Sequence, residues 1–188
     1  MSCVIVLGCF RSGTSGVAGI LHHLGVTMGK EFDEPNQNNP KGFWEDKAFK
    51  TIHTWCDEGR EVDQLYENLV RDREEEFPLW GVKDPLLCLY IHKLTGFLKT
   101  DHKLIVCRRP IEEISKSMGR SIGFDDPEMF LNLAKYYVEE MEKSLNSYRG
   151  PVLEVRFKDL NKSVLGIANF VGLPVNEQAL KFIDGNLS

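Results

Sequence analysis

The segment VLGCFRSGTSG, residues 6–16, contains the residue types that bind a phosphate or sulfate group. Its candidate donors are Arg11, Ser12, Gly13, Thr14 and Ser15. A glycine loop between a strand and a helix gathers backbone N–H groups and the helix N-terminus around one point, and the planar guanidinium of Arg11 suits an oxyanion. The segment follows the ATP-binding pattern G-x-x-x-x-G-K-[ST], except that Thr14 replaces the lysine. Because that lysine reaches the β and γ phosphates of a nucleotide, the loop predicts a ligand shorter than a triphosphate.

Four apolar runs predict the strands that position this loop. They are residues 3–8, 79–83, 103–107 and 151–156. Continuous apolar runs are typical of strands covered on both faces, as in a parallel sheet. Apolar stripes at helical spacing lie between them, beginning at Val17, Leu87, Phe130 and Leu160. Strands that alternate with helices predict an α/β fold with right-handed crossovers.

Two polar segments stand apart from this pattern. The segment VTMGKEFDEPNQNNPKGF, residues 26–43, is long and rich in Asn, Pro and Gly. Loops of that length in compact domains are often functional, so we expect it to contribute to a site. The charge run RDREEEFP, residues 71–78, predicts a solvated helix face and the end of that helix.

Length and composition exclude several classes of protein. The 188 residues predict one domain, 1–188, with a sizeable core. The net charge of −5 at pH 7 argues against nucleic-acid binding and against a long polyanionic acceptor. The sequence has no apolar run of about 18 residues, so we expect no membrane span. Cysteines without C-x-x-C spacing predict reduced thiols in a cytoplasmic protein, and the adjacent His22 and His23 diverge on a helix, so we expect no metal site.

The loop FRSGTS, residues 10–15, resembles the first motif of the sulfotransferases that use 3′-phosphoadenosine 5′-phosphosulfate (PAPS). The family loop reads P-[KR]-S-G-T-[ST], and Phe10 stands here in place of the proline. The resemblance extends over residues 4–183 and implies a three-layer α/β/α fold with a central parallel sheet, like that of P-loop nucleoside triphosphatases. It also implies PAPS as co-substrate without a metal. Residues 12–15 would hold the 5′-phosphate, and Arg11 would stabilise charge as the sulfuryl group leaves.

The segment KLIVCRRPIEEISKSM is similar to the motif that binds the 3′-phosphate in this family. Arg108 lies two residues before a proline, as the motif arginine does, and a serine on the following helix completes the family's site. An arginine between a strand end and a helix start can clamp a phosphate. The family spacing of the serine falls on Lys116 here, so the choice between Ser115 and Ser117 stays open, with Ser117 the leading candidate.

Two further resemblances supply candidate catalytic residues. The segment NPKGFWED is similar to one in bacterial sulfotransferases, and its Glu45 is the leading candidate for the base that takes the acceptor proton. A carboxylate can act in this way once burial raises its pKa. Many family members use a histidine instead, so His53 is the alternative. The segment WGVKDP is similar to the family pattern W-x-x-K-x-P, which implies that Lys83 faces the sulfuryl group or the acceptor and that Asp84 orients Lys83.

Together these motifs predict transfer of a sulfuryl group from PAPS to a hydroxyl or amine of a small-molecule or carbohydrate acceptor. One of Trp44, Trp55 and Trp80 would stack on the adenine, and the sequence does not choose among them. Two alternatives stay open. One is a Mg-ATP-dependent small-molecule kinase with an altered loop, against which the absent lysine argues. The other is a non-catalytic nucleotide-binding relative. The sequence predicts neither the acceptor's identity nor the oligomeric state.

Overall fold

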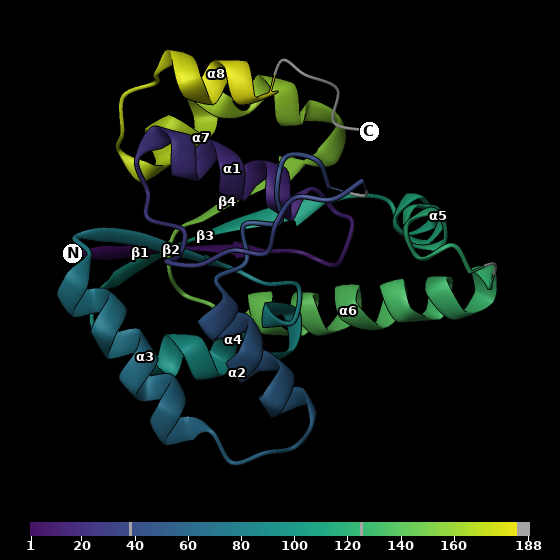
Figure 1. Ribbon diagram of the computed structural model, residues 1–188, viewed down its shortest axis with the longest axis horizontal. Coiled ribbons are helices and arrows are strands. Elements are labelled where there is room, and N and C mark those ends of the chain that lie inside the picture. Colours follow the sequence, from purple (N-terminus) through teal and green to yellow (C-terminus); the bar gives the residue numbers. More distant parts are fainter. Residues whose placement is uncertain (38, 125, 184–188) are drawn as a thin grey trace.

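Four parallel strands form the sheet that positions the glycine loop (Figure 1). They are β1 (Ser2–Leu7), β2 (Leu79–Lys83), β3 (Asp101–Arg108) and β4 (Val152–Arg156). The computed structural model describes residues 1–37, 39–124 and 126–183, and in it the strands lie in the order β2-β1-β3-β4. Because β1 pairs with both β2 and β3, the loop that follows it opens between the carboxyl ends of its two neighbours.

Helices cover both faces of the sheet and make it the middle of three layers (Figure 1). On one face lie α1 (Thr14–Leu24), α7 (Val164–Val171) and α8 (Glu177–Ile183). On the other lie α2 (Lys47–Asp57), α3 (Asp63–Glu76), α4 (Leu87–Phe97) and α6 (Pro127–Ser147). The helix α5 (Ile111–Ile122) lies beyond the carboxyl end of the strands, and the 3₁₀ helix η1 (Phe157–Lys162) follows β4. None of the described helices is both long and apolar enough to cross a membrane.

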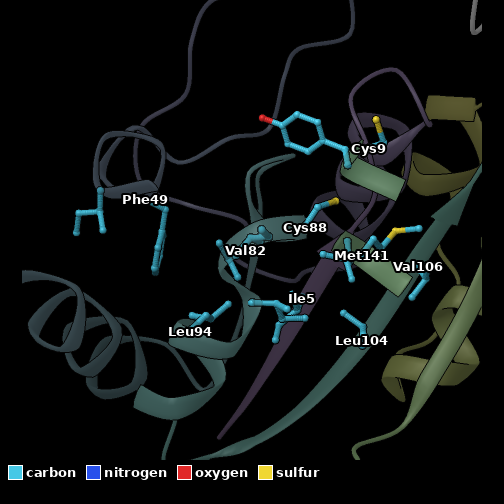
Figure 2. Close-up of a cluster of buried hydrophobic side chains, with 14 of the residues drawn as sticks. Ile5, Cys9, Phe49, Val82, Cys88, Leu94, Leu104, Val106 and Met141 are labelled. Carbon is cyan, nitrogen blue, oxygen red and sulfur yellow. The ribbon is translucent and has the colours of Figure 1, made fainter. Parts of the chain in front are cut away.

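Alternate residues of β1 contribute to two apolar cores, one on each face of the sheet. Ile5 packs in the core shared with α2, α4 and α6, whereas its neighbours Val4 and Val6 pack against α1 and α7. Figure 2 shows the first of these cores, with Ile5, Val82, Leu104 and Val106 from the strands and Phe49, Leu94 and Met141 from the helices. Successive side chains of a strand point to opposite faces, which explains why the apolar run is continuous.

The predicted strands and the three-layer α/β/α fold are confirmed. The strand β2 has the predicted bounds, and the other strands differ from prediction by one or two residues at an end. The apolar stripes that begin at Val17, Leu87 and Phe130 lie in α1, α4 and α6, and the stripe that begins at Leu160 spans η1 and α7. The helices α2 and α8 were not predicted.

The charge run RDREEEFP ends α3 as expected, but the prediction that it is a solvated face is wrong for two of its members. Arg73 and Glu74 are only 6% and 7% exposed. Arg73 forms an ion pair with Asp46, and a carboxylate oxygen of Glu74 accepts hydrogen bonds from the backbone N–H groups of Lys99 and Thr100. Buried charges require such partners, and these partners come from distant segments that local sequence does not reveal.

Candidate functional site

A cavity of about 440 Å³ lies where β1 and β2 end. Its polar lining includes Arg11, Gly13, Thr14, Ser15, Glu45, Lys83, Arg109, Ser117 and Arg120. Its apolar lining includes Phe10, Phe43, Met118, Ile122, Leu133 and Phe157. Parallel α/β sheets bind ligands at the carboxyl ends of their strands, so this cavity is the candidate site. The segment 26–43 contributes to it as predicted, through its residues from Asn39 to Phe43.

Unusual backbone angles and internal hydrogen bonds fix the conformation of the loop after β1, which lines the cavity. Gly13 has a φ of 99°, and a Cβ atom at this position would lie 2.8 Å from a phenylalanine ring of η1, so glycine is required. Arg11 has a φ of 64°, which is uncommon for a residue with a side chain. Its carbonyl accepts a hydrogen bond of 2.9 Å from Nη1 of Arg109. The Ser12 hydroxyl turns inward and donates to the Cys9 carbonyl at 2.6 Å, so it stabilises the turn.

The N-terminus of α1 faces the cavity through Thr14 and Ser15. Its N-cap residue, Gly13, has no side chain to accept from the first backbone N–H groups, and the first turn contains no acidic residue. These N–H groups and the positive end of the helix dipole therefore remain suited to an anion.

Lys83 and Glu45 form an ion pair on the cavity wall. The ammonium Nζ lies 2.5 Å from Oε1 of Glu45, and the two side chains are 3% and 12% exposed. The same Nζ donates at 3.1 Å to the Ser15 hydroxyl and at 3.1 Å to the Phe43 carbonyl. All three hydrogens of the ammonium thus have an acceptor. The pair places a cation against the start of α1 and a carboxylate beside it, within one cavity.

Three guanidinium groups line the cavity: Arg11 of the loop, Arg109 between β3 and α5, and Arg120 of α5. Nε of Arg11 donates to the Ser117 hydroxyl at 3.1 Å. The guanidinium of Arg109 packs on the ring of Phe157, with 3.9 Å between the guanidinium carbon and the ring centroid. Removal from water lowers the pKa of Arg11, and the nearby charges of Arg109 and Arg120 lower it further. Like charges gathered in this way favour an anionic ligand.

The structure does not bring Arg108 to the cavity. Its guanidinium pairs instead with Glu142 of α6 and, at 2.7 Å, with Glu154 of β4. The next residue, Arg109, lines the cavity in its place. Sequence reasoning missed Arg109, because successive residues at a strand end point in opposite directions and the Arg-Arg pair gives no sign of which one faces the site.

The structure places the two candidate serines in different surroundings. Ser117 lines the cavity and contacts Arg11, as described above. The Ser115 hydroxyl donates to the Pro127 carbonyl at 3.3 Å and so faces α6. Only Ser117 of the two is placed beside the other candidate residues.

The two candidate bases also differ in position. Glu45 lines the cavity, whereas His53 is fully buried behind it. Nδ1 of His53 lies 2.9 Å from Oδ2 of Asp84, and its Nε2 lies 2.7 Å from the Tyr66 hydroxyl. With both ring nitrogens occupied, His53 has a structural position. Asp84 contacts His53 rather than orienting Lys83.

The three tryptophans lie outside the described lining of the cavity. Trp80 is buried and stacks on Phe49, with 5.7 Å between ring centroids. Trp55 lies beneath the guanidinium of Arg60, and Trp44 packs against His22. The aromatic rings that do line the cavity are phenylalanines.

Cysteines and metal ligands contribute little to this site. Burial raises the pKa of Cys9, in the loop, to about 12 and that of Cys107, on β3, also to about 12. These thiols therefore stay protonated and behave as small apolar side chains. Over residues 1–37, 39–124 and 126–183, no group of three or more His, Cys, Asp and Glu side chains is arranged to hold a metal ion.

Comparison with solved structures places this architecture among sulfotransferases and a nucleoside kinase. The sulfotransferase domain of the Synechococcus PCC 7002 olefin synthase is similar with a TM-score of 0.63 and 18% identity, over 99% of this chain and 78% of that one. Sulfotransferase STF1 from Mycobacterium tuberculosis H37Rv gives 0.57 and 12% identity, over 97% and 70%. Deoxyadenosine kinase from M. mycoides with bound dATP gives 0.55 and 13%, over 90% and 99%.

The sequence itself matches no protein-family model and no curated protein. At identities of 12–18%, the structural similarities show the fold and not the activity. The chain therefore has an α/β fold of the P-loop type, shared by sulfotransferases and at least one nucleoside kinase.

Proposed function

We propose that this protein is a sulfotransferase that moves a sulfuryl group from PAPS to a hydroxyl or amine. The observation that supports this most is the ion pair of Lys83 and Glu45 in the cavity. The ammonium of this pair also donates to the Ser15 hydroxyl and so lies beside the glycine loop. Sulfuryl transfer needs a cradle for the departing phosphate, a cation for the developing charge and a base for the acceptor proton. All three groups line one cavity.

The reaction proposed is an in-line displacement at sulfur. The acceptor oxygen forms a bond to sulfur while the bond from sulfur to the bridging oxygen of the 5′-phosphate breaks. The electron pair of the broken bond stays on that oxygen, and the acceptor proton passes to Glu45. The products are a sulfate ester and adenosine 3′,5′-bisphosphate.

The loop would bind the 5′-phosphate and the transferring group. The backbone N–H groups at Gly13, Thr14 and Ser15 would donate to the phosphate, and Ser12 would keep the turn in shape. Arg11 and Lys83 would stabilise charge on the bridging oxygen and on the sulfuryl oxygens. As Lys83 turns to this anion, the Glu45 carboxylate would be released to accept a proton.

The 3′-phosphate would bind at the guanidinium cluster. Arg109 and Ser117 line the cavity. The family pattern also points to a serine on α5, but its arginine is Arg108, which does not line the cavity. We assign the clamp to Arg109 and Ser117, because Arg108 already has two carboxylate partners on the far side.

A nucleotide kinase is the second candidate, and one contact favours it. Nζ of Lys83 lies 3.1 Å from the Ser15 hydroxyl, so a lysine from β2 approaches the loop where the pattern lysine is missing. The similarity to deoxyadenosine kinase extends over 99% of that kinase. A kinase of this type would bind ATP with Mg²⁺. A relative that binds nucleotide without turnover is the third possibility.

Calorimetric titration separates these candidates. Adenosine 3′,5′-bisphosphate should bind without Mg²⁺, and ATP should bind more weakly with or without it. Binding of ATP that depends on Mg²⁺, with no binding of the bisphosphate, would establish the kinase instead. Bisphosphate binding without sulfate-ester formation across a broad acceptor screen would indicate the non-catalytic relative.

Two adjacent arginines provide matched variants for the same titration. Arg109→Met should weaken bisphosphate binding at least about tenfold, because it removes a charge-assisted contact. Arg108→Met should leave the affinity within about twofold. The reverse result would assign 3′-phosphate binding to Arg108, as the family resemblance implies.

A further inference from the structure

Exposed apolar side chains occur at the end of α5, just after it, and along the first half of α6. Ile122, Phe124, Met129, Leu133 and Tyr136 are 65%, 57%, 43%, 38% and 50% exposed. We refer to these five residues as the α5–α6 patch. Met129, Leu133 and Tyr136 recur at i, i+4 and i+7, so they share one face of α6. A helix in a globular protein normally buries such a face, and a contiguous exposed patch marks a binding surface.

The patch is continuous with the candidate site. Ile122 and Leu133 line the cavity as well as belonging to the patch. They share the cavity lining with Phe10 and Met118. The Phe10 ring also packs edge-on against Tyr137 of α6, with 5.1 Å between centroids. An apolar surface therefore runs from the loop after β1, past α5, onto the outer face of α6.

The rest of the molecule offers no comparable surface among the described residues. The other exposed large apolar side chains are Met1, Leu65, Val152, Leu165 and Leu180. They are dispersed over the N-terminus, α3, β4, α7 and α8. Single exposed apolar residues of this kind are ordinary, whereas the α5–α6 patch adjoins a cavity.

The cavity has a charged part and a mainly apolar part. Arg11, Lys83 and Arg109 belong to the loop side, which suits an anionic group. On the side of α5 and α6, Met118, Ile122 and Leu133 supply apolar lining, and Arg120 and Ser121 of α5 line the cavity as well. A ligand that uses both parts has an anionic or reacting end and an apolar end. It is the apolar part of such a ligand that would cover the patch.

We propose that the acceptor is an amphiphile whose alkyl or aryl moiety lies along the α5–α6 patch while its hydroxyl or amine faces Glu45. This rests on the proposed function, because it names the substrate class of the same site. The apolar moiety leaves the cavity past Ile122 and Leu133 and packs on the face of α6 that contains Met129 and Tyr136. A carbohydrate acceptor has only the small C–H faces of its rings and no extended apolar moiety to cover this patch.

Binding of two sulfate esters tests the proposal without knowledge of the natural acceptor. Octyl sulfate and methyl sulfate share the sulfate ester expected of the product and differ only in their chain. Each is titrated calorimetrically, below the micelle concentration of octyl sulfate, into protein saturated with adenosine 3′,5′-bisphosphate. Each methylene removed from water strengthens binding about fourfold, so partial burial of the chain should make octyl sulfate bind at least about tenfold tighter.

Matched variants locate the apolar contact. Leu133→Asn and Ile122→Asn should each reduce the preference for octyl over methyl sulfate at least about threefold. Leu165→Asn on α7, which changes a 61% exposed leucine outside the patch, should leave the preference unchanged. Unaltered affinity for the bisphosphate in all three variants shows that each of them is folded.

Three results would overturn the proposal. They are equal binding of the two esters, a chain preference that survives both patch variants, and a dimer in light scattering that disappears in Leu133→Asn. The dimer would assign the patch to a second copy of the chain. Absence of bisphosphate binding would contradict the proposed function, and the ester titrations are then repeated without nucleotide. If Leu133→Asn then removes a preference for octyl sulfate, an apolar ligand on the patch is still supported. If the protein shows no such preference, an apolar ligand on the patch is rejected.

Discussion

Glu45 and Asp46 are adjacent in sequence, yet each forms an ion pair of a different kind. Glu45 faces the cavity and pairs with Lys83 from β2. Asp46 is 2% exposed and pairs at 2.8 Å with Arg73 from α3. Its carboxylate also accepts from the backbone N–H of Lys30 at 3.0 Å, and it caps α2 by accepting from the backbone N–H of Ala48 at 2.9 Å. One pair borders the cavity, and the other is enclosed by protein.

The difference shows how the fold positions a reactive group. Asp46 has each of its oxygens occupied, so it fixes the backbone at the start of α2. Trp44, with a φ of 60°, turns the chain directly before Glu45. Glu45 lies between these two fixed points, so its carboxylate is directed at Lys83 without needing contacts of its own with the core. The enclosed pair fixes the backbone, whereas the pair at the cavity lies where an entering anion would meet the Lys83 ammonium.

The largest effect is expected from breaking the enclosed pair. Arg73→Met leaves the Asp46 carboxylate buried without its cation, which should lower the free energy of unfolding by about 3–5 kcal/mol. Urea denaturation measures this loss. Arg71→Met, at an exposed position on the same helix, is the control and should change the free energy by no more than about 0.5 kcal/mol. A loss no larger than that of the control would mean that the enclosed pair does not stabilise the fold.

Breaking the pair at the cavity should affect turnover more than stability. Lys83→Met and Glu45→Gln should each reduce sulfate-ester formation at least about a hundredfold, because each removes a group that acts on the transferring sulfuryl group or the acceptor proton. The rate is measured with radiolabelled PAPS and an accepted hydroxyl compound. Lys50→Met removes an exposed lysine that pairs with Asp33, and it should leave the rate unchanged. A Lys83 variant that keeps its rate would reduce this pair to a structural contact like that of Asp46.

The comparison of the two pairs also shows which features the sequence could predict. The strands and the glycine loop are local: continuous apolar runs and closely spaced glycines and hydroxyls are visible within ten residues. Glu45 and Lys83 were predicted through resemblance to family motifs, and the structure brings them together. The Arg73–Asp46 pair was not predicted, since a charge run does not show which member finds a distant carboxylate.

Arg109 lines the cavity, and the predicted Arg108 does not, for a geometric reason. Arg108 and Arg109 have the same side chain and differ only in direction. Their direction depends on the phase of β3 at its last residue, and an error of one residue moves a side chain to the opposite face. Arg108 points to the side where Glu142 and Glu154 lie, and it pairs with both. These two glutamates are distant in sequence and form no motif with Arg108.

A smaller effect should follow from removing one partner of Lys83. Ser15→Ala deletes the hydroxyl that accepts from Nζ but leaves the contacts with Glu45 and the Phe43 carbonyl. Loss of one hydrogen bond of this kind should weaken bisphosphate binding about fivefold, measured by calorimetry. Ser147→Ala, at the far end of α6, is the control and should bind normally. Lys83→Met is titrated in parallel, and a loss of bisphosphate affinity in Ser15→Ala as large as in that variant would show that the hydroxyl itself, rather than the ammonium, binds the anion.

The smallest effect concerns pH and the turn that precedes the two carboxylates. Trp44 packs against His22, with 4.6 Å between ring centroids, and His23 lies beside both. Partial removal from water lowers the pKa of His22 below its usual 6.5, as does the neighbouring His23. Between the lowered pKa and 6.5 the unfolded chain binds more protons, so the free energy of unfolding should fall as the pH falls through this range. Urea denaturation at pH 7.5 and 5.5 measures the fall, and His22→Phe, which keeps a ring against Trp44, should reduce it. An unchanged fall in that variant would place the titrating group outside the turn before Glu45.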